Sequence, residues 1–266
     1  MEKGISFFVG FKDEPETRAR MIKDAGFDRV ITTADPKFDH QNKPIKEQAK
    51  LFEKLGLKPS SLHMTYQTDE LPYFWEEGEY GDMMTKRLIQ DVKYAHEFGF
   101  TCVVTHLFGK YSKIGEERLL KVLEQCNKLD VPLAIENIDD QKLFLEVFDK
   151  IKHPKLKFCY DSGHNNFVDK GFDYLGKFKD KLITLHLHDN DGTWDMHTLN
   201  RFGNIDWQMI GEKLNKDIIL DYELLLAYKD PNLNAMQHIL ECKQQADELE
   251  KIILEAEAKR LKNQTI

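Results

Sequence analysis

Six apolar runs, spread along the whole chain, each end on a side chain that can bind a metal ion. These residues are His63, His106, Glu136, Asp161, His186 and Glu223. Two short loop motifs, Asp-Ser-Gly-His and Asp-Met-His, add His164, Asp195 and His197. Imidazole and carboxylate ligands without thiolate suit zinc, manganese, iron or cobalt. The pattern therefore predicts a divalent metal site, provided that the fold brings these distant residues together.

The residue types leave the number of bound ions open, between one and three. A single ion would polarise a carbonyl or bind two adjacent hydroxyls, which suits the isomerisation of a sugar. Two ions about 3.5–4 Å apart would share a hydroxide or clamp a substrate oxygen, with a glutamate bridging them. Taken alone, a histidine at a strand end is more often structural than a ligand. The joint pattern, which uses five of the ten histidines, is what indicates a metal site.

Eight strand-like runs alternate with segments of helical periodicity. The predicted strands are residues 4–9, 29–32, 58–62, 101–105, 132–135, 156–160, 182–187 and 218–222. Helical stripes lie between them, such as Met84, Leu88, Val92 and Ala95. Glycines at 26, 56 and 99 stand where helix C-caps are expected. This alternation predicts an α/β fold with a parallel sheet.

Two arrangements fit that alternation: a closed (β/α)8 barrel and an open, doubly wound sheet. The distribution of the candidate ligands decides between them. In a closed barrel, all strands point their C-terminal ends at one face, so ligands from six strands meet in one pocket. In an open sheet, the same residues would be spread along an edge. The sequence therefore favours the (β/α)8 TIM barrel.

Length and composition are consistent with one barrel. The chain has 266 residues, 41% of them hydrophobic and 32% charged. We expect one domain over residues 1–266, with a helical C-terminal extension from about residue 231 to 262 that either is solvated or serves self-association into a homo-oligomer. The net charge of −8 argues against nucleic acid as a partner, because phosphate binding draws on Lys and Arg.

The cysteines and the N-terminus predict a cytoplasmic protein. None of Cys102, Cys126, Cys159 and Cys242 belongs to a Cys-x-x-Cys pair, and two lie inside apolar runs, so we expect buried, reduced thiols without a part in the site. The first residues lack the apolar core of a signal peptide. No apolar run approaches the roughly 20 residues needed to cross a bilayer, so we expect no membrane partner.

The motifs taken together resemble the xylose isomerase-like TIM barrel superfamily, which includes sugar phosphate isomerases and epimerases and endonuclease IV. The resemblance covers most of the chain, up to Glu223. The pieces that carry it, in chain order, are Ser-Leu-His63, Val-Val-Thr-His106, Ala-Ile-Glu136-Asn137, Tyr-Asp161-Ser-Gly-His164, Leu-His186-Leu-His188-Asp189, Asp195-Met-His197 and Tyr-Glu223.

The resemblance implies which residues hold which ion. Four residues match the single-metal quartet of the sugar isomerases: Glu136, Asp161, His186 and Glu223. His63 and His106, which share Glu136, match the second metal position of endonuclease IV. His164, Asp195 and His197 match its third position. Asn137 and Asp189 are expected to orient the ligands.

The leading hypothesis is a metal-dependent isomerase or epimerase that acts through an enediolate on a small sugar, sugar phosphate or polyol, with one to three zinc or manganese ions. Glu136 and Glu223 would be its acid and base. His188, Lys110, Arg201 and Trp194 are candidate substrate contacts, the alternative being a structural or surface role. The loops at 66–81 and 190–206 carry aromatic residues and would lie above the pocket.

Two other functions remain open. One is an endonuclease IV-like zinc phosphodiesterase acting on abasic-site DNA, and the other is a non-catalytic barrel that binds a metal or a sugar. Two departures weaken the nuclease hypothesis: no histidine follows the first strand, and His106-Leu-Phe-Gly stands where His-Pro-Gly is usual. The signature of the ketose 3-epimerase subgroup around the fifth strand is also absent.

Overall fold

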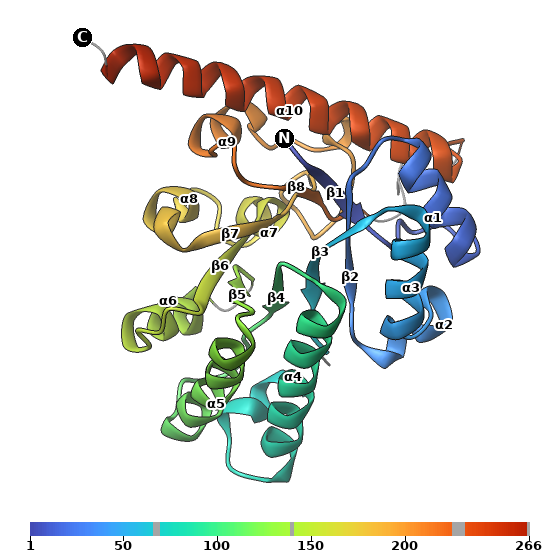
Figure 1. The fold of residues 1–266 in the computed structure, drawn as a ribbon. Helices are drawn as coiled ribbons and strands as arrows, with labels where there is room; N and C mark the ends of the chain where they lie inside the picture. Colours follow the sequence, from blue (N-terminus) through green and yellow to red (C-terminus); the bar gives the residue numbers. More distant parts are fainter. Residues whose placement is uncertain (66–69, 139–140, 225–231, 265–266) are drawn as a thin grey trace.

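The computed structural model describes residues 1–65, 70–138, 141–224 and 232–264. Parallel strands form the centre of the molecule and helices surround them (Figure 1). The strands are β1 (Lys3–Ser6), β2 (Arg29–Thr33), β3 (Lys58–His63), β4 (Cys102–Thr105), β5 (Leu133–Glu136), β6 (Leu156–Asp161), β7 (Leu182–His186) and β8 (Leu220–Tyr222).

The helices lie mainly on the outside of this ring. They are α1 (Pro15–Asp24), α2 (Asp39–Asn42), α3 (Ile45–Leu55), α4 (Glu79–Phe98), α5 (Lys113–Leu129), α6 (Gln141–Lys150), α7 (Ser162–Phe167), α8 (Tyr174–Lys177), α9 (Trp207–Lys213) and α10 (Ala235–Gln264). Short 3-10 turns are η1 (Pro36–Phe38), η2 (Leu71–Trp75), η3 (Lys179–Lys181) and η4 (Asn200–Phe202).

The strand order is that of a barrel. Neighbouring strands between β1 and β7 pair in parallel in chain order, and β8 pairs in parallel with β1. The ring closes between β7 and β8 through a parallel bridge from Leu187 to Tyr222, with Leu187 N donating to Asp221 O at 2.9 Å. The prediction of a (β/α)8 TIM barrel is confirmed, and the open sheet is excluded.

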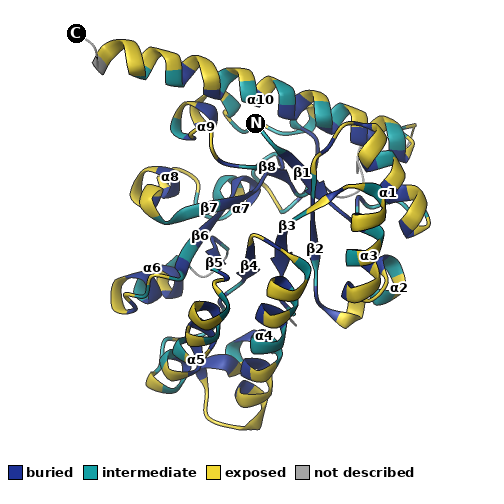
Figure 2. Cartoon of the chain, viewed as in Figure 1, coloured by how far each residue is buried: buried dark blue, intermediate teal, exposed yellow. Residues whose placement is uncertain are grey.

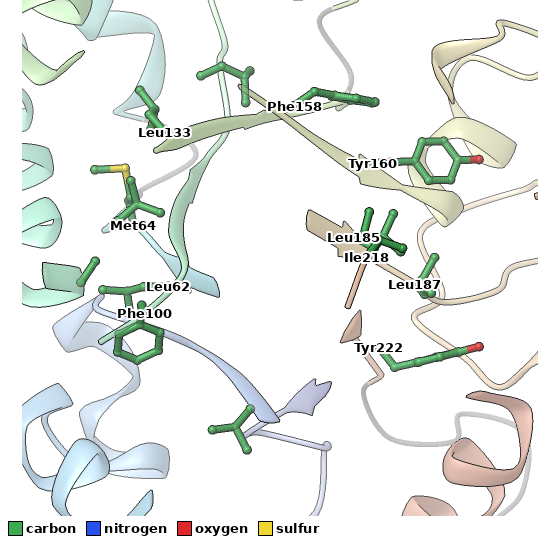
Figure 3. Packing of buried hydrophobic residues seen from close by; sticks show 14 of the residues in the cluster. Leu62, Met64, Phe100, Leu133, Phe158, Tyr160, Leu185, Leu187, Ile218 and Tyr222 are labelled. Atoms are coloured by element: carbon green, nitrogen blue, oxygen red, sulfur yellow. The ribbon is translucent and has the colours of Figure 1, made fainter. Parts of the chain in front are cut away.

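Alternation along the strands separates an outer layer from the barrel interior. Outward residues such as Leu62, Phe158 and Tyr160 belong to the large core between the strands and the helices (Figure 3). A smaller inner cluster consists of Cys102, Val104, Ala134 and Cys159. Figure 2 shows the consequence, with buried strands at the centre and exposed faces on the outer side of the helices. Since the outward residues alternate with His63 and Asp161, the candidate ligands face the interior.

Local sequence signals account for the helix boundaries. Gly56 and Gly99 end α3 and α4 at φ 65° and 75°, a left-handed conformation that glycine adopts without steric cost. Ser112 caps α5 by accepting from Gly115 N at 3.1 Å. The predicted stripe of α4 is buried, from Met84 to Ala95. Periodicity and caps thus set the layer that positions the strand ends.

The first strand is shorter than predicted. It ends at Ser6, whereas the apolar run suggested residues 4–9. Phe7 and Val9 are fully buried, but beyond the end of the strand. The prediction was wrong there because burial alone does not distinguish a strand from a buried loop.

The long helix α10 crosses the barrel beside β8, β1 and α1, and its C-terminal end passes α9 (Figure 1). Arg260 near that end donates to Glu212 O at 3.0 Å and to Leu214 O at 2.9 Å, so α10 packs on the end of α9 as far as this residue. In the described part of the chain, no helix combines the length and apolar character that crossing a bilayer requires.

Candidate metal centre

Four strand ends bring the predicted quartet together at one end of the barrel. Glu136, Asp161 and His186 are the last residues of β5, β6 and β7, and Glu223 directly follows β8. Asp161 lies in register beside His186. Each of the four residues offers a ligand atom, and these atoms all lie within 4.8 Å of one another. The parallel strands thus gather residues that are far apart in the sequence.

The contacts within this quartet suit a shared cation. His186 Nδ1 lies 2.8 Å from Glu136 Oε2 and 3.0 Å from Glu223 Oε2. Nevertheless, His186 Nδ1 and both carboxylate oxygens of Glu136 are buried without a hydrogen bond among the described residues. Two ligands at about 2.1 Å from one ion and about 90–109° apart would be about 3.0–3.4 Å from each other. These buried atoms lie close together without forming hydrogen bonds in the described part of the chain. A divalent ion between them would supply the partner that each atom lacks.

A second group shares Glu136 with the quartet. His106 Nε2 lies 3.3 Å and His63 Nε2 3.9 Å from Glu136 Oε2, and the two imidazole nitrogens are 3.2 Å apart. Burial, followed by the neighbouring His106, lowers the pKa of His63 to about 4. At neutral pH its ring is therefore uncharged, which is the form in which an imidazole binds a metal.

A third group extends outward from the quartet and consists of His164, His188, Asp195 and His197. Asp195 Oδ2 lies 2.9 Å from His197 Nε2 and 3.4 Å from His164 Nε2. His164 Nδ1 also approaches Glu136 Oε1 at 3.0 Å, which links this group to the quartet. Each of the nine residues predicted as ligands belongs to at least one of the three groups.

His197 has a left-handed backbone, with φ 44°. A non-glycine residue rarely adopts this conformation, and it is held there by a hydrogen bond between His197 Nδ1 and Glu223 O at 3.0 Å. The strained turn aims the other ring nitrogen at Asp195. The sequence motif predicted that the two residues act together, but it gave no sign of this strain.

The charges within the centre are strongly coupled. Burial raises the pKa of Glu136, but the imidazoles of His186 and His106 outweigh this effect and hold that pKa well below its usual value. For His164 and His186 the balance is reversed: burial lowers the pKa, yet neighbouring groups, carboxylates prominent among them, raise it well above the usual value. Hydrogen bonding to Asp195 likewise overcomes burial and raises the pKa of His197 to about 9. Without a metal, protonated imidazoles supply the positive charge that the carboxylates require.

His188, predicted as a substrate contact, is fully buried behind the ligands. Its Nε2 lies 3.1 Å from Asp161 Oδ2, and its ring stacks on that of His197. The structure places it among the candidate ligands rather than at the cavity wall. The alternation His186-Leu-His188 was the signal, since residues two apart on a strand share a face.

Cys159 also differs from the expectation that the cysteines take no part. All four cysteines are buried and unpaired, as predicted. However, Cys159 Sγ lies within 4.8 Å of ligand atoms of Glu136 and His186. Burial raises the pKa of this thiol well above its ordinary value, so it remains protonated beside His186. Its position two residues before Asp161 was the signal for this contact.

Hydrogen bonds fix the quartet from behind. Asn137 donates from Nδ2 to Asp161 O at 2.9 Å and accepts from Asp161 N at 2.8 Å. Asp161 caps α7 by accepting from His164 N at 2.7 Å. Asp189 has a different role from the one predicted: it accepts from Trp207 Nε1 at 2.6 Å and from three backbone amides, and so holds the loop after β7.

A cavity of about 350 Å³ opens onto the centre. Eight of the nine predicted ligands line it, all except Asp161, which is fully buried. The opposite wall comes from Ser6, Phe7, Phe8, Ile31, Thr32, Thr33, Phe38, Asn42 and Ser61, with Phe108 and Ile138 beside it. The cavity thus combines a ligand-rich wall with a largely aromatic and hydroxyl-bearing one.

Three predicted substrate contacts lie away from this cavity. Arg201 pairs with Glu241 on α10 and lies over the ring of Phe202, with 3.9 Å to its centroid. Lys110 is exposed and Trp194 is 43% exposed, and neither lines the cavity wall in the described part of the chain. Of the two aromatic loops, residues 66–69 lie outside the described residues.

The chain belongs to the family described as xylose isomerase-like TIM barrel, which it matches over residues 19–252. A curated relative, an uncharacterized protein of Sinorhizobium fredii, is 33% identical over 92 residues, or 32% of this chain and 30% of that protein. The chain thus matches less than a third of the length of that relative.

Solved structures share the fold over nearly the whole chain. A D-tagatose 3-epimerase-like protein is similar with TM-score 0.76 and 19% identity, covering 96% of this chain and 99% of that one. D-psicose 3-epimerase with D-tagatose, from Clostridium cellulolyticum H10, is similar with TM-score 0.71 and 14% identity, covering 95% and 99%.

Proposed function

We propose that the protein is a metal-dependent isomerase or epimerase of a small sugar, sugar phosphate or polyol. One observation carries the proposal: ligand atoms of Glu136, Asp161, His186 and Glu223 lie within 4.8 Å of one another, and His186 Nδ1 and both carboxylate oxygens of Glu136 have no hydrogen-bond partner among the described residues. The names of the similar sugar epimerases support the same class of reaction.

The residues fit zinc or manganese, because imidazole and carboxylate are ligands that both ions accept. When bound, such an ion would polarise the substrate carbonyl and stabilise negative charge on its oxygen. The quartet would hold the first ion. His63 and His106 with Glu136, and His164, Asp195 and His197, are the ligands proposed for further ions, with His188 directly behind the last group.

Glu136 and Glu223 are the proposed acid and base, since both line the cavity and contact His186 from β5 and β8. One carboxylate takes the proton from the carbon next to the carbonyl. The electron pair of that C–H bond forms the C=C bond of an enediolate, and the carbonyl electron pair moves to its oxygen. Return of a proton by the other carboxyl group to the opposite face of the same carbon, with the carbonyl re-formed at its original oxygen, gives the epimer. Return of the proton to the former carbonyl carbon gives the isomer, provided that the adjacent hydroxyl passes its proton to the original carbonyl oxygen and becomes the new carbonyl.

The test is incorporation of solvent deuterium into a panel of ketoses by protein loaded with manganese or zinc. We expect exchange at the carbon next to the carbonyl in the wild type and none in Glu223→Gln. Exchange that persists in Glu223→Gln would contradict the proposed acid–base role of Glu223. Sugar binding without exchange in the wild type would instead indicate a non-catalytic sugar-binding barrel.

A second candidate, phosphodiester hydrolysis of abasic-site DNA, is favoured by one observation. Together with the quartet, the second and third groups supply ligands for up to three ions, as the resemblance to endonuclease IV implies. Metal analysis distinguishes the candidates, since three zinc ions per chain favour the hydrolase and one ion favours the isomerase. Cleavage of an abasic-site duplex at low salt would favour the phosphodiesterase over the isomerase or epimerase.

We further propose that residues 1–266 form one domain in which α10 is the last barrel helix. Its packing on α9 through Arg260 supports this proposal over a separate extension. Limited proteolysis tests it, because a packed α10 resists cleavage along with the barrel, whereas an independent extension is removed first.

A further inference from the structure

A buried arginine, Arg18, contacts residues that form the cavity wall opposite the metal ligands. Arg18 on α1 is only 1% exposed, although no carboxylate forms a direct ion pair with it in the described part of the chain. Its guanidinium lies over the rings of Phe7 and Phe8, with 4.5 and 5.4 Å to their centroids. Burial lowers the pKa of Arg18 to about 10, so the group still carries its charge at neutral pH. The aromatic faces, together with the charges of Asp13 and Glu14, which raise the pKa of Arg18 against the effect of burial, thus take the place of a direct ion pair.

The same arginine fixes the orientation of Asn42. Arg18 Nη2 donates to Asn42 Oδ1 at 2.9 Å and to Gln41 O at 2.9 Å. Asn42 is 3% exposed and lines the cavity. Because its carboxamide oxygen is engaged with Arg18, its NH2 group is the part left for a ligand. Asn42 is therefore set as a hydrogen-bond donor.

Thr32 lies on the same wall but, unlike Asn42, presents a hydrogen-bond acceptor to the cavity. Its hydroxyl donates to Gln48 Oε1 at 2.6 Å, and Gln48 is held in turn by donating to Lys43 O at 2.7 Å. With its proton committed, Thr32 can only accept a hydrogen bond from a ligand. Nearby, Ser61 Oγ is buried and has no hydrogen-bond partner among the residues that the structure describes, so it can donate to a ligand or accept from one.

The wall thus offers Asn42 as a donor, Thr32 as an acceptor and the Ser61 hydroxyl, which can do either. This combination suits the hydroxyl groups of a sugar, because each of them can both donate and accept a hydrogen bond. It does not match a phosphate dianion, which only accepts and would face the Thr32 oxygen. Phe7, Phe8 and Phe38 would also remove water from such a charge without replacing its hydrogen bonds. In the described lining of the cavity there is no Lys or Arg.

We propose that this wall, between β1, β2 and α2, is a subsite for the uncharged, hydroxyl-bearing end of the substrate, with Arg18 as the positioning residue that sets Asn42, Phe7 and Phe8. The inference rests on the proposed function and narrows it: the substrate is a neutral sugar and not a sugar phosphate. Arg18 itself does not line the cavity and acts through these three residues.

The experiment compares D-fructose and D-tagatose with their 6-phosphate esters, using manganese-loaded protein. Binding is measured by calorimetry and turnover by deuterium exchange. In the wild type we expect the neutral sugars to bind at least tenfold more tightly than their esters. Asn42→Asp keeps an acceptor for Arg18 but replaces the donor, so we expect about a tenfold or larger rise in KM for the neutral sugars with kcat nearly unchanged.

Arg18→Met should raise KM in the same way, and Arg18→Lys should restore part of the loss. The matched control is Arg29→Met: Arg29 begins β2 at the other end of the barrel and pairs with Glu2 at 2.7 Å. This variant can lose stability but should keep the KM of the wild type. A KM rise in Arg29→Met equal to that in Arg18→Met would contradict a specific role for Arg18.

The outcomes separate the subsite from the proposed function. Exchange with the esters but not with the neutral sugars overturns the subsite and leaves the isomerase standing. Binding of neutral sugars that is lost in Asn42→Asp, without exchange, supports the subsite and contradicts the isomerase. Binding of neither neutral sugar overturns the subsite.

Discussion

The imidazole of His188 lies flat against that of His197, with ring centroids 3.9 Å apart and planes 10° apart. On its other side His188 Nε2 contacts Asp161 at 3.1 Å, while His197 Nε2 contacts Asp195 at 2.9 Å. One buried ring therefore connects the quartet with the outer group of ligands.

Replacing His188 tests this connection. His188→Asn removes both the stacked ring and the contact with Asp161, so we expect the affinity for an outer ion to fall about 10- to 100-fold, as for other residues that support a metal ligand. Zinc titration with a competing chelator measures it. The control is His96→Asn, on the exposed face of α4. Equal affinities in His188→Asn and the wild type would contradict the role of the stack.

Gly163 gives the His188 ring its space. A Cβ at this position would lie 1.9 Å from His188 Cε1. We expect Gly163→Ala to destabilise the protein by about 1–3 kcal/mol in chemical denaturation, because the ring must move. In a His188→Ala background the same change should cost much less, since the clash is gone. Additive effects of the two substitutions would refute this explanation.

Metal binding should release protons. In the metal-free protein the pKa of His197 is raised to about 9, and those of His164 and His186 are raised well above the usual value. At pH 7 these rings hold protons that an ion must displace, so the metal affinity should rise with pH. Calorimetry in buffers of different ionisation enthalpy measures the released protons. Heats that do not depend on the buffer would show that the rings are already neutral.

Asp91 on α4 predicts a pH dependence of folding. It is buried and accepts from Thr65 N at 2.7 Å, and burial raises its pKa to about 7. A raised pKa means that the folded state binds the proton more tightly than the unfolded state. The stabilisation is therefore complete below about pH 4 and is lost as the pH rises through 7, by an amount on the order of 4 kcal/mol.

The measurement is the free energy of unfolding from pH 5 to 8 in the wild type and in Asp91→Asn. The amide introduced at position 91 still accepts from Thr65 but does not titrate. The free energy of unfolding of the wild type should therefore fall relative to that of Asp91→Asn as the pH rises. Asp221, whose pKa burial also raises to about 7, leaves a residual slope in both proteins. Parallel pH profiles of the two proteins would contradict the assignment to Asp91.

The barrel and the meeting of the nine candidate ligands could be predicted from the sequence for a physical reason. In a parallel barrel the C-terminal ends of all strands lie at the same end of the barrel, so residues that end different strands come close together in space. His63, Glu136 and His186 each end a strand and face the interior as expected. That these residues bind metal stays a prediction.

The roles of Arg201 and Arg18 could not be predicted from the sequence, because they depend on tertiary contacts. Arg201 looked like a substrate contact because its loop follows β7, but Glu241 of α10 pairs with it instead. Arg18 gave no local signal, since its importance comes from Phe7 and Asn42, residues on other elements. Loops and buried polar pairs are set by neighbours far along the chain, which periodicity does not encode.

Anomalous X-ray diffraction from crystals of the protein soaked in manganese or zinc tests whether the four residues at the ends of β5 to β8 hold one ion. We expect a peak about 2.0–2.3 Å from ligand atoms of Glu136, Asp161, His186 and Glu223 together. A peak that none of these four residues contacts, or no peak at saturating metal, would contradict it.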